Sequence, residues 1–197
     1  MIAAIVLAAG ESKRMGEPKM ALPWGSTTVL GQVLVTFANA GVDEIVVVTG
    51  AHRGVVEGIV DEARVSLPVR SVFNAEFAQR GMLSSVQCGV RSLTGKAYGA
   101  TLIGLGDQPQ VKERSVRRVV EAAGGESPLV VPSFQQRRGH PWLVKGGLWQ
   151  SILELSAPQT LRDFLNLHQA DICYVATDDD GVLSDLDTPE AYRKFQP

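Results

Sequence analysis

Apolar and polar residues follow each other along this chain in two different rhythms. Short runs rich in valine, isoleucine and leucine are typical of strands buried on both faces of a sheet, and they occupy residues 2–7, 44–49, 69–73, 101–105 and 172–176. Segments with helical spacing fall at residues 28–40, 54–64, 84–93, 112–123, 160–168 and 189–195. Strands and helices in alternation predict a doubly wound α/β fold, in which a mostly parallel sheet carries helices on both faces.

The rhythm changes after Gly125. Residues 129–132 and 141–144 read as short strands joined by a polar turn, and their spacing suits a small β-hairpin inserted at one end of the sheet. A further helix is expected at residues 147–155. No repeat or linker divides the 197 residues, a length typical of one domain. The sequence therefore predicts a single domain, 1–197, built on a Rossmann-like sheet with a β-hairpin insertion.

Composition excludes several classes of function. An apolar content of 45% and a charged content of 20% are those of an ordinary globular protein. The net charge of −2 argues against a nucleic-acid partner. Cys88 and Cys173 lie far apart without metal-ligand spacing, which indicates reduced thiols. The apolar start of the chain has no basic residue before it and is too short to span a membrane, so we expect a cytoplasmic protein without a membrane partner.

The segment after the first predicted strand combines small and cationic residues. It reads Leu-Ala-Ala-Gly-Glu-Ser-Lys-Arg-Met-Gly-Glu-Pro-Lys over residues 7–19. Small residues let backbone N–H groups approach an anion, and Lys13, Arg14 and Lys19 offset its charge. The spacing matches neither a G-x-G-x-x-G turn nor a Walker loop, and a surface turn with solvated charges is the alternative. The combination favours a loop that binds phosphate.

Three carboxylates follow predicted strands and are expected to meet at one edge of the sheet. Asp107 comes directly after the apolar run 102–106, where an unpaired charge is costly, and Mg²⁺ is a natural partner for it. Asp185 and Asp187 lie on the same face of an extended segment. The alternative is that Asp107 caps the helix at 112–123, and that Asp185 or Asp187 caps the last helix.

The run Leu7-Ala8-Ala9-Gly10-x-Ser12-x-Arg14-Met15-Gly16-x-x-Lys19 closely resembles the signature loop of the MobA-like nucleotidyltransferases. Among them it looks most like the molybdenum cofactor cytidylyltransferase branch. The resemblance continues in four later segments, in the family's order: Gly-Met-Leu-Ser-Ser at 81–85, Asp-Gln-Pro at 107–109, Gly-His-Pro at 139–141 and Asp-Leu-Asp-Thr-Pro at 185–189. Together these motifs extend over essentially the whole chain.

The resemblance also implies roles for individual residues. Nucleotide binding would fall to Leu7, Ala8, Ala9, Gly10, Ser12, Arg14, Gly16, Lys19, Asn74, Ser84 and Asp107. Within this group, Arg14, Lys19 and Asp107 would be catalytic, and Asp107 with Asp187 would hold Mg²⁺. The acceptor side would include Ser85, His140 and Asp185. Helix capping by Ser84 or Ser85 and a packing role for His140 are the alternatives.

The activity that the resemblance implies is magnesium-dependent transfer of CMP from CTP to the terminal phosphate of molybdopterin, with release of pyrophosphate. A recipient molybdoenzyme is then a possible protein partner. The guanylyltransferase branch, which uses GTP, and the sugar-phosphate nucleotidyltransferases are alternatives with the same chemistry. A non-catalytic molybdopterin carrier is the alternative of another class. Such a carrier has little use for two metal-binding carboxylates and releases no pyrophosphate, so an enzyme is favoured.

Overall fold

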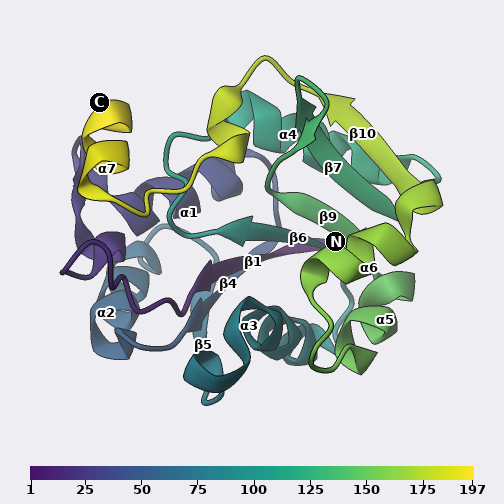
Figure 1. Ribbon diagram of the computed structural model, residues 1–197, viewed down its shortest axis with the longest axis horizontal. Coiled ribbons are helices and arrows are strands. Elements are labelled where there is room, and N and C mark those ends of the chain that lie inside the picture. Colours follow the sequence, from purple (N-terminus) through teal and green to yellow (C-terminus); the bar gives the residue numbers. More distant parts are fainter.

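The computed structural model describes residues 1–197 and contains a central sheet of eight strands with helices on both faces (Figure 1). The strands are β1 (Ile2–Ala8), β4 (Glu44–Thr49), β5 (Val69–Phe73), β6 (Ala100–Leu105), β7 (Leu129–Phe134), β8 (Arg137–Arg138), β9 (Trp142–Lys145) and β10 (Ile172–Ala176). Their order is β10-β7-β9-β6-β1-β4-β5, with β8 paired to β7. Strand β1 runs parallel to β4 and β6, β4 to β5, and β7 to β10. This is the mostly parallel α/β fold that the sequence predicts.

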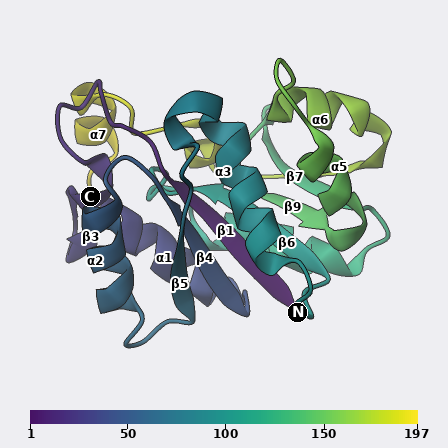
Figure 2. The ribbon, with the colours of Figure 1, turned by 90° about the horizontal axis from the view of Figure 1, so that it is seen from below.

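Two apolar cores lie on opposite faces of the sheet. One joins the sheet to α1 (Val29–Asn39), α2 (Arg53–Ala63) and α4 (Glu113–Glu121). The other joins it to α3 (Phe77–Leu93), α5 (Trp149–Glu154) and α6 (Leu161–Leu167). Figure 2 shows α3, α5 and α6 together on one side of the sheet. None of the helices combines the length and apolar character needed to cross a membrane.

The predicted hairpin strands are β7 and β9, and they are part of the central sheet. They pair with each other, Leu129 opposite Val144 and Val130 opposite Leu143. However, β9 also pairs antiparallel with β6, so it lies between β6 and β7. The physical reason is burial, because Trp142, Leu143 and Val144 all have relative exposures of 8% or less and therefore need cover on both faces. The tight turn connects β7 to β8.

Helix α3 begins earlier than its apolar spacing predicts and is interrupted at Gly81. Residues 77–80 form a first turn, and Gly81 then has φ 57° and ψ −149°, a conformation that glycine adopts without a steric penalty. Helical geometry resumes after it and continues to Leu93. The interruption places Gly81 and Met82 in the wall of two clefts described below.

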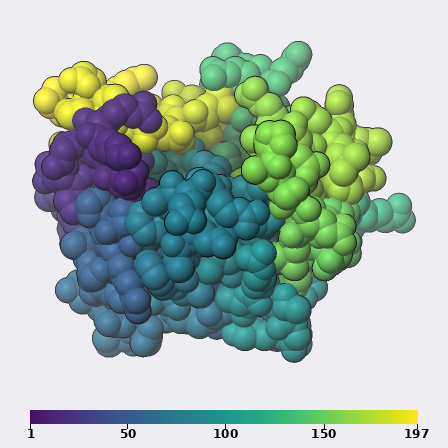
Figure 3. All heavy atoms as spheres, turned by 60° about the horizontal axis from the view of Figure 1, so that its bottom comes forward, coloured from purple at the N-terminus to yellow at the C-terminus, as the bar shows by residue number.

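The C-terminal helix α7 (Pro189–Phe195) lies against the loop that follows β1 (Figure 3). A small antiparallel pair, β2 (Pro23–Trp24) and β3 (Thr27–Thr28), lies in the sequence between this loop and α1. Trp24 and Leu186 share a buried apolar cluster, against which Met15 and Tyr192 pack. Short 3-10 helices complete the chain, at Lys19–Ala21, Ala122–Gly124, Gly146–Leu148, Gln169–Asp171 and Asp180–Leu183. The cluster joins residues from both ends of the sequence.

Candidate active site

The carboxyl end of β1 is held closely by the strands on either side of it. The Gly106 amide donates to the Leu7 carbonyl at 2.9 Å, and the Ala51 amide donates to the Ala9 carbonyl at 3.2 Å. At Gly50 an added Cβ would lie 2.5 Å from the Ala9 carbonyl oxygen, so only glycine fits there. The small residues Ala9, Gly50 and Gly106 therefore let the carboxyl ends of β1, β4 and β6 lie close together. The loop after β1 begins at this edge of the sheet.

The loop after β1 presents a series of unpaired backbone amides. None of the N–H groups of residues 10–14 donates to another backbone carbonyl. The amides of Met15 and Gly16 instead turn back to the Ser12 carbonyl, and Ser12 adopts a positive φ of 52°. A cleft of about 240 Å³ lies against this loop, lined among others by Ser12 and Arg14. Consecutive free amides around a concave surface are typical of anion-binding sites.

Lys19 is the centre of an ion-pair network at this edge. Its ammonium group donates to a carboxylate oxygen of Asp107 and, at 2.7 Å, to Oδ1 of Asp187. Arg14 donates to the other oxygen of Asp187, Oδ2. The side chains of Lys19 and Asp107 are only 10% and 11% exposed. Three segments that are distant in sequence thus bring two cations and two carboxylates together, as the sequence predicts.

The pKa shifts in this network reflect the strength of its pairing. Burial alone would lower the pKa of Lys19, but the charges and hydrogen bonds of Asp107 and Asp187 outweigh burial and raise it. Burial would likewise raise the pKa of Asp187, whereas its contacts with Lys19 and Arg14 lower it. Lys19 therefore stays cationic and Asp187 anionic at neutral pH.

Asp185 adds a third carboxylate to the same cleft. It accepts a hydrogen bond from Gln108 at 2.8 Å, and it does not contact Lys19 directly. Its pKa is raised by burial and then by the negative charges of Asp107 and Asp187, which the Gln108 hydrogen bond only partly offsets. The cleft thus has an excess of negative charge beyond what Lys19 balances.

The capping alternatives for these carboxylates do not hold. Helix α4 has Lys112 at its N-cap, so Asp107 does not cap it. The N-cap of α7 is Thr188, whose hydroxyl accepts from the Ala191 amide. Asp107, Asp185 and Asp187 instead point into a common cleft of about 300 Å³.

The predicted nucleotide-binding residues fall into three groups. Those that line the main cleft or the neighbouring loop cleft are Leu7, Ala9, Gly10, Ser12, Arg14, Lys19 and Asp107, and the predicted acceptor-side residues Ser85 and Asp185 join them there. Ala8 is buried inside the sheet, and Gly16 supplies a positive φ of 75° that turns the loop. Asn74 and Ser84 lie behind the wall of the cleft, 4% and 2% exposed.

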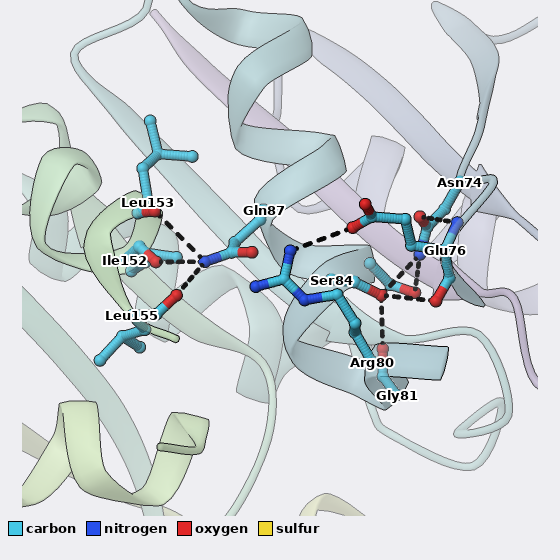
Figure 4. A network of polar contacts seen from close by, with 10 residues as sticks. Asn74, Glu76, Arg80, Gly81, Ser84, Gln87, Ile152, Leu153 and Leu155 are labelled. Carbon is cyan, nitrogen blue, oxygen red and sulfur yellow. Dashed lines mark hydrogen bonds and ion pairs between the residues drawn. The ribbon is translucent and has the colours of Figure 1, made fainter. Parts of the chain in front are cut away.

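Asn74 and Ser84 belong to a buried hydrogen-bond network (Figure 4). The Asn74 amide donates to the hydroxyls of Ser84 and Ser85, at 2.9 and 3.1 Å, while its carbonyl oxygen accepts from the Glu76 amide. The Ser84 hydroxyl donates to the Gly81 carbonyl at 2.9 Å. Both side chains are thus engaged within the protein, and their direct contact with nucleotide stays a prediction. They support the turn at Gly81.

A second cleft, of about 560 Å³, lies next to the first and shares Gly81 and Met82 with it. His140 and Trp142 form part of its wall, with ring centroids 4.6 Å apart and planes inclined by 15°. Its charged lining residues are all arginines: Arg80, Arg138 and Arg162. Burial lowers the pKa of His140 to about 4, so the ring is neutral at pH 7. This cleft has the flat wall and the positive charge that an anionic heterocycle requires.

Comparison with known protein families agrees with this geometry. The model of the MobA-like NTP transferase domain matches residues 4–172. The chain belongs to this family. As a MobA-like protein it is an enzyme of the nucleotidyltransferase type.

Several relatives of this MobA-like protein cover nearly its whole length. Nicotine blue oxidoreductase of Paenarthrobacter nicotinovorans is 30% identical over 96% of this chain and 93% of its own. The molybdenum cofactor cytidylyltransferase of Escherichia coli is 26% identical over 95% and 92%. A solved nucleotidyl transferase of Methanothermobacter has 26% identity and a TM-score of 0.83, covering 100% of this chain and 96% of its own. The shared fold therefore occurs with more than one named activity.

The MobA-like site fits a divalent metal ion that is shared with substrate. Enzymes of the family usually use one. No group of three or more histidine, cysteine, aspartate or glutamate side chains is placed to hold a metal. However, Asp107 and Asp187 converge on the Lys19 ammonium, so a cation already fits between them. Magnesium is commonly held by one or two carboxylates together with substrate phosphates.

Sequence reasoning missed several residues of the cleft. Glu11, Met20 and Phe77 line it, and Glu11 forms an ion pair with Lys13 at 2.7 Å. Met82 lines both clefts and is 51% exposed, although it lies inside the motif at 81–85. The available signal for Met82 in the sequence was its position directly after Gly81, in a motif that also contains two serines. Phe77 carried no such signal, because its position depends on the turn before Gly81.

Proposed function

We propose that this MobA-like protein transfers CMP from CTP to the terminal phosphate of molybdopterin, with Mg²⁺ as the metal ion. The observation that carries the proposal is the meeting of Lys19, Arg14, Asp107 and Asp187 beside the free amides of residues 10–14. That arrangement supplies cations and N–H donors for a triphosphate and carboxylates for a metal ion. The similarity to the cytidylyltransferase of Escherichia coli supports CTP and molybdopterin as substrates.

The proposed reaction is a displacement at phosphorus. An oxygen of the acceptor's phosphate attacks the α-phosphorus of CTP and forms the new P–O bond. The bond from that phosphorus to the bridging oxygen of the β-phosphate breaks, and its electrons leave with pyrophosphate. When bound between Asp107 and Asp187, Mg²⁺ would neutralise phosphate charge.

The protein's own groups would position the substrates and offset their charge. The amides of residues 10–14 would bind the β- and γ-phosphates, and Arg14 would stabilise the charge that accumulates on pyrophosphate. Lys19 lines both the main cleft and the loop cleft. Its ammonium group would therefore be within reach of phosphates bound in either cleft. Catalysis of this kind depends on positioning and charge stabilisation more than on proton transfer.

The second cleft would hold the acceptor. Its common border with the main cleft at Gly81 and Met82 allows one molecule to extend from Arg162 to the carboxylates. The neutral ring of His140 would provide a flat surface and no proton, since an acceptor phosphate needs no base. Ser85 and Asp185 line the main cleft and would contact the acceptor there.

Thermal unfolding with nucleotides tests the donor. We would melt the protein with CTP, GTP, ATP and UTP, each with and without Mg²⁺. A ligand at about 100 times its dissociation constant adds about 2.7 kcal/mol, which raises the melting temperature of a chain of this size by roughly 5–10 °C. A magnesium-dependent shift confined to CTP supports the proposal, and a shift confined to GTP assigns the guanylyltransferase reaction instead.

Pyrophosphate release in the presence of molybdopterin then tests the transfer. Release that requires both CTP and molybdopterin supports the proposed reaction. Binding of molybdopterin without any pyrophosphate release would identify a carrier and overturn it. Because one relative is named an oxidoreductase, a reduced nicotinamide nucleotide is included in the melts, and stabilisation by it alone would also contradict the proposal.

A further inference from the structure

The two carboxylates proposed to hold a metal ion already share a cation. The Lys19 ammonium donates to Asp107 and, at 2.7 Å, to Oδ1 of Asp187. The remaining oxygen of Asp187, Oδ2, accepts from Arg14. Lys19 therefore occupies the position where the two carboxylates converge, and a metal ion that bridges them would have to displace it.

Lys19 cannot leave this position without a second anionic partner. Its side chain is 10% exposed, so an ammonium group withdrawn from both carboxylates would lose its pairing without gaining much hydration. A metal ion between the carboxylates would also lie within a few ångströms of the Lys19 ammonium group. The two positive charges would repel each other strongly, because little water screens them at this buried site. A metal ion alone therefore meets a competing positive charge inside the site.

The loop cleft offers the second partner when a triphosphate is bound. Lys19 lines this cleft together with Arg14 and the amides of residues 10–14, as well as the main cleft that holds Asp107. A phosphate oxygen there can accept the ammonium hydrogen bonds that Asp107 and Asp187 now accept. Rotation of one flexible side chain would thus exchange a carboxylate contact for a phosphate contact and open the space between the carboxylates.

We infer that Lys19 acts as an internal counter-ion that keeps metal out of the site until nucleotide binds, so that nucleotide and metal ion bind as a coupled pair. This inference rests on the proposed function for its nucleotide. Linkage makes the coupling reciprocal: nucleotide strengthens metal binding by the same factor by which metal strengthens nucleotide binding. Lys19 is then the counter-ion of Asp107 and Asp187 before nucleotide binds, and a phosphate ligand afterwards.

Binding of Mn²⁺ to the protein stripped of metal tests the inference without any turnover. The signal of free Mn²⁺ in electron paramagnetic resonance reports the fraction bound. Lys19→Met keeps the length and apolar stem of the side chain but removes its charge. We expect Lys19→Met to bind Mn²⁺ without nucleotide at least about tenfold more tightly than the unmodified protein. In the unmodified protein, a CTP analogue with a methylene group between the α- and β-phosphates should raise Mn²⁺ affinity by a similar factor, after subtraction of the Mn²⁺ that the analogue binds without protein.

The matched control is Lys96→Met, which removes a lysine that is 43% exposed, pairs with Glu44 and lies outside both clefts. Its Mn²⁺ affinity should equal that of the unmodified protein. The double variant Lys19→Met with Asp107→Asn should lose the gain, which assigns the bound ion to this site. If Lys19→Met does not fold, Lys19→Gln retains hydrogen-bond donors without charge and takes its place.

Equal Mn²⁺ affinity in Lys19→Met and the unmodified protein overturns the inference. This comparison uses no nucleotide, so it remains decisive even if the proposed function is wrong. Conversely, a gain in Lys19→Met without any effect of the CTP analogue on Mn²⁺ binding would retain the counter-ion but overturn the coupling. Failure of every nucleotide to stabilise the protein would contradict the proposed function and leave the counter-ion result standing.

Discussion

The ammonium group of Lys19 and the carboxylate of Asp107 form a buried ion pair across 88 positions of sequence. Lys19 belongs to the loop after β1, and Asp107 to the loop after the neighbouring strand β6. The segment after each strand contributes one buried charge that would be costly alone, and the parallel pairing of β1 with β6 brings the two charges together. At the carboxyl edge of the sheet, the pairing of Lys19 with Asp107 thus offsets the free-energy cost of burying each charge.

Asp107→Asn should retain the fold and lose most of the activity. The amide keeps the shape of the side chain, and Lys19 keeps its contact with Asp187. Loss of the carboxylate charge should reduce the rate of pyrophosphate release by about 10²–10³ at any Mg²⁺ concentration. Asp178→Asn, which removes a carboxylate that is 74% exposed and pairs with Arg114, is the control and should change nothing. Near-normal magnesium-dependent turnover by Asp107→Asn would contradict the metal-binding role.

Arg14→Gln should weaken nucleotide binding without affecting stability. The Arg14 side chain is 68% exposed, and surface ion pairs of this kind contribute about 0–1 kcal/mol to folding. The loss of its charge from the loop after β1 should nevertheless reduce CTP affinity by roughly 10- to 150-fold, since a charge-assisted contact with phosphate is worth about 1.5–3 kcal/mol. Isothermal titration with CTP and Mg²⁺ measures the affinity. Arg53→Gln removes a 55% exposed arginine outside the loop, and an equal loss of affinity there would argue against a specific role.

The sequence predicts the layers of this fold better than it predicts the contacts within the site. Runs such as residues 44–49 are apolar at nearly every position, so their burial on both faces requires no knowledge of neighbours. By contrast, the position of β9 depends on two partners, and local spacing alone indicated a hairpin. The predicted roles of Lys19 and Asp187 rest on family motifs, because an ion pair across 168 positions has no local signal.

Asn74 illustrates the same limit for polar residues. Its place after a strand is compatible both with a ligand and with a structural hydrogen bond. The structure engages its amide with Ser84 and Ser85, and this choice depends on the turn at Gly81, which the apolar spacing did not predict. For polar residues behind a cleft wall, position in a motif therefore does not distinguish a ligand contact from a structural hydrogen bond.

Stability should fall as the pH is lowered through the range in which His140 titrates in the unfolded chain. Burial lowers its pKa from 6.5 to about 4, so between these values the unfolded state binds more protons and stability rises with pH. His140→Phe should therefore lose less stability between pH 6.5 and 4, by at most about 3 kcal/mol. Urea unfolding at several pH values measures this. His52→Gln, which removes a ring at the surface beside the Glu11 carbonyl, should retain the steep dependence.

Gln87→Leu should impair acceptor binding while leaving nucleotide binding intact. The buried Gln87 amide donates to the carbonyls of Ile152, Leu153 and Leu155, at 3.0, 3.4 and 2.9 Å, and thereby fixes the end of α5 to α3 (Figure 4). Leucine conserves the volume but leaves these carbonyls unpaired, which should cost about 1–3 kcal/mol of stability. Since α5 contacts α6, which lines the second cleft, we expect the KM for molybdopterin to rise several-fold at unchanged CTP affinity. Gln150→Leu, whose amide bonds only the exposed Glu154, is the control, and equal kinetics in both variants would refute the coupling.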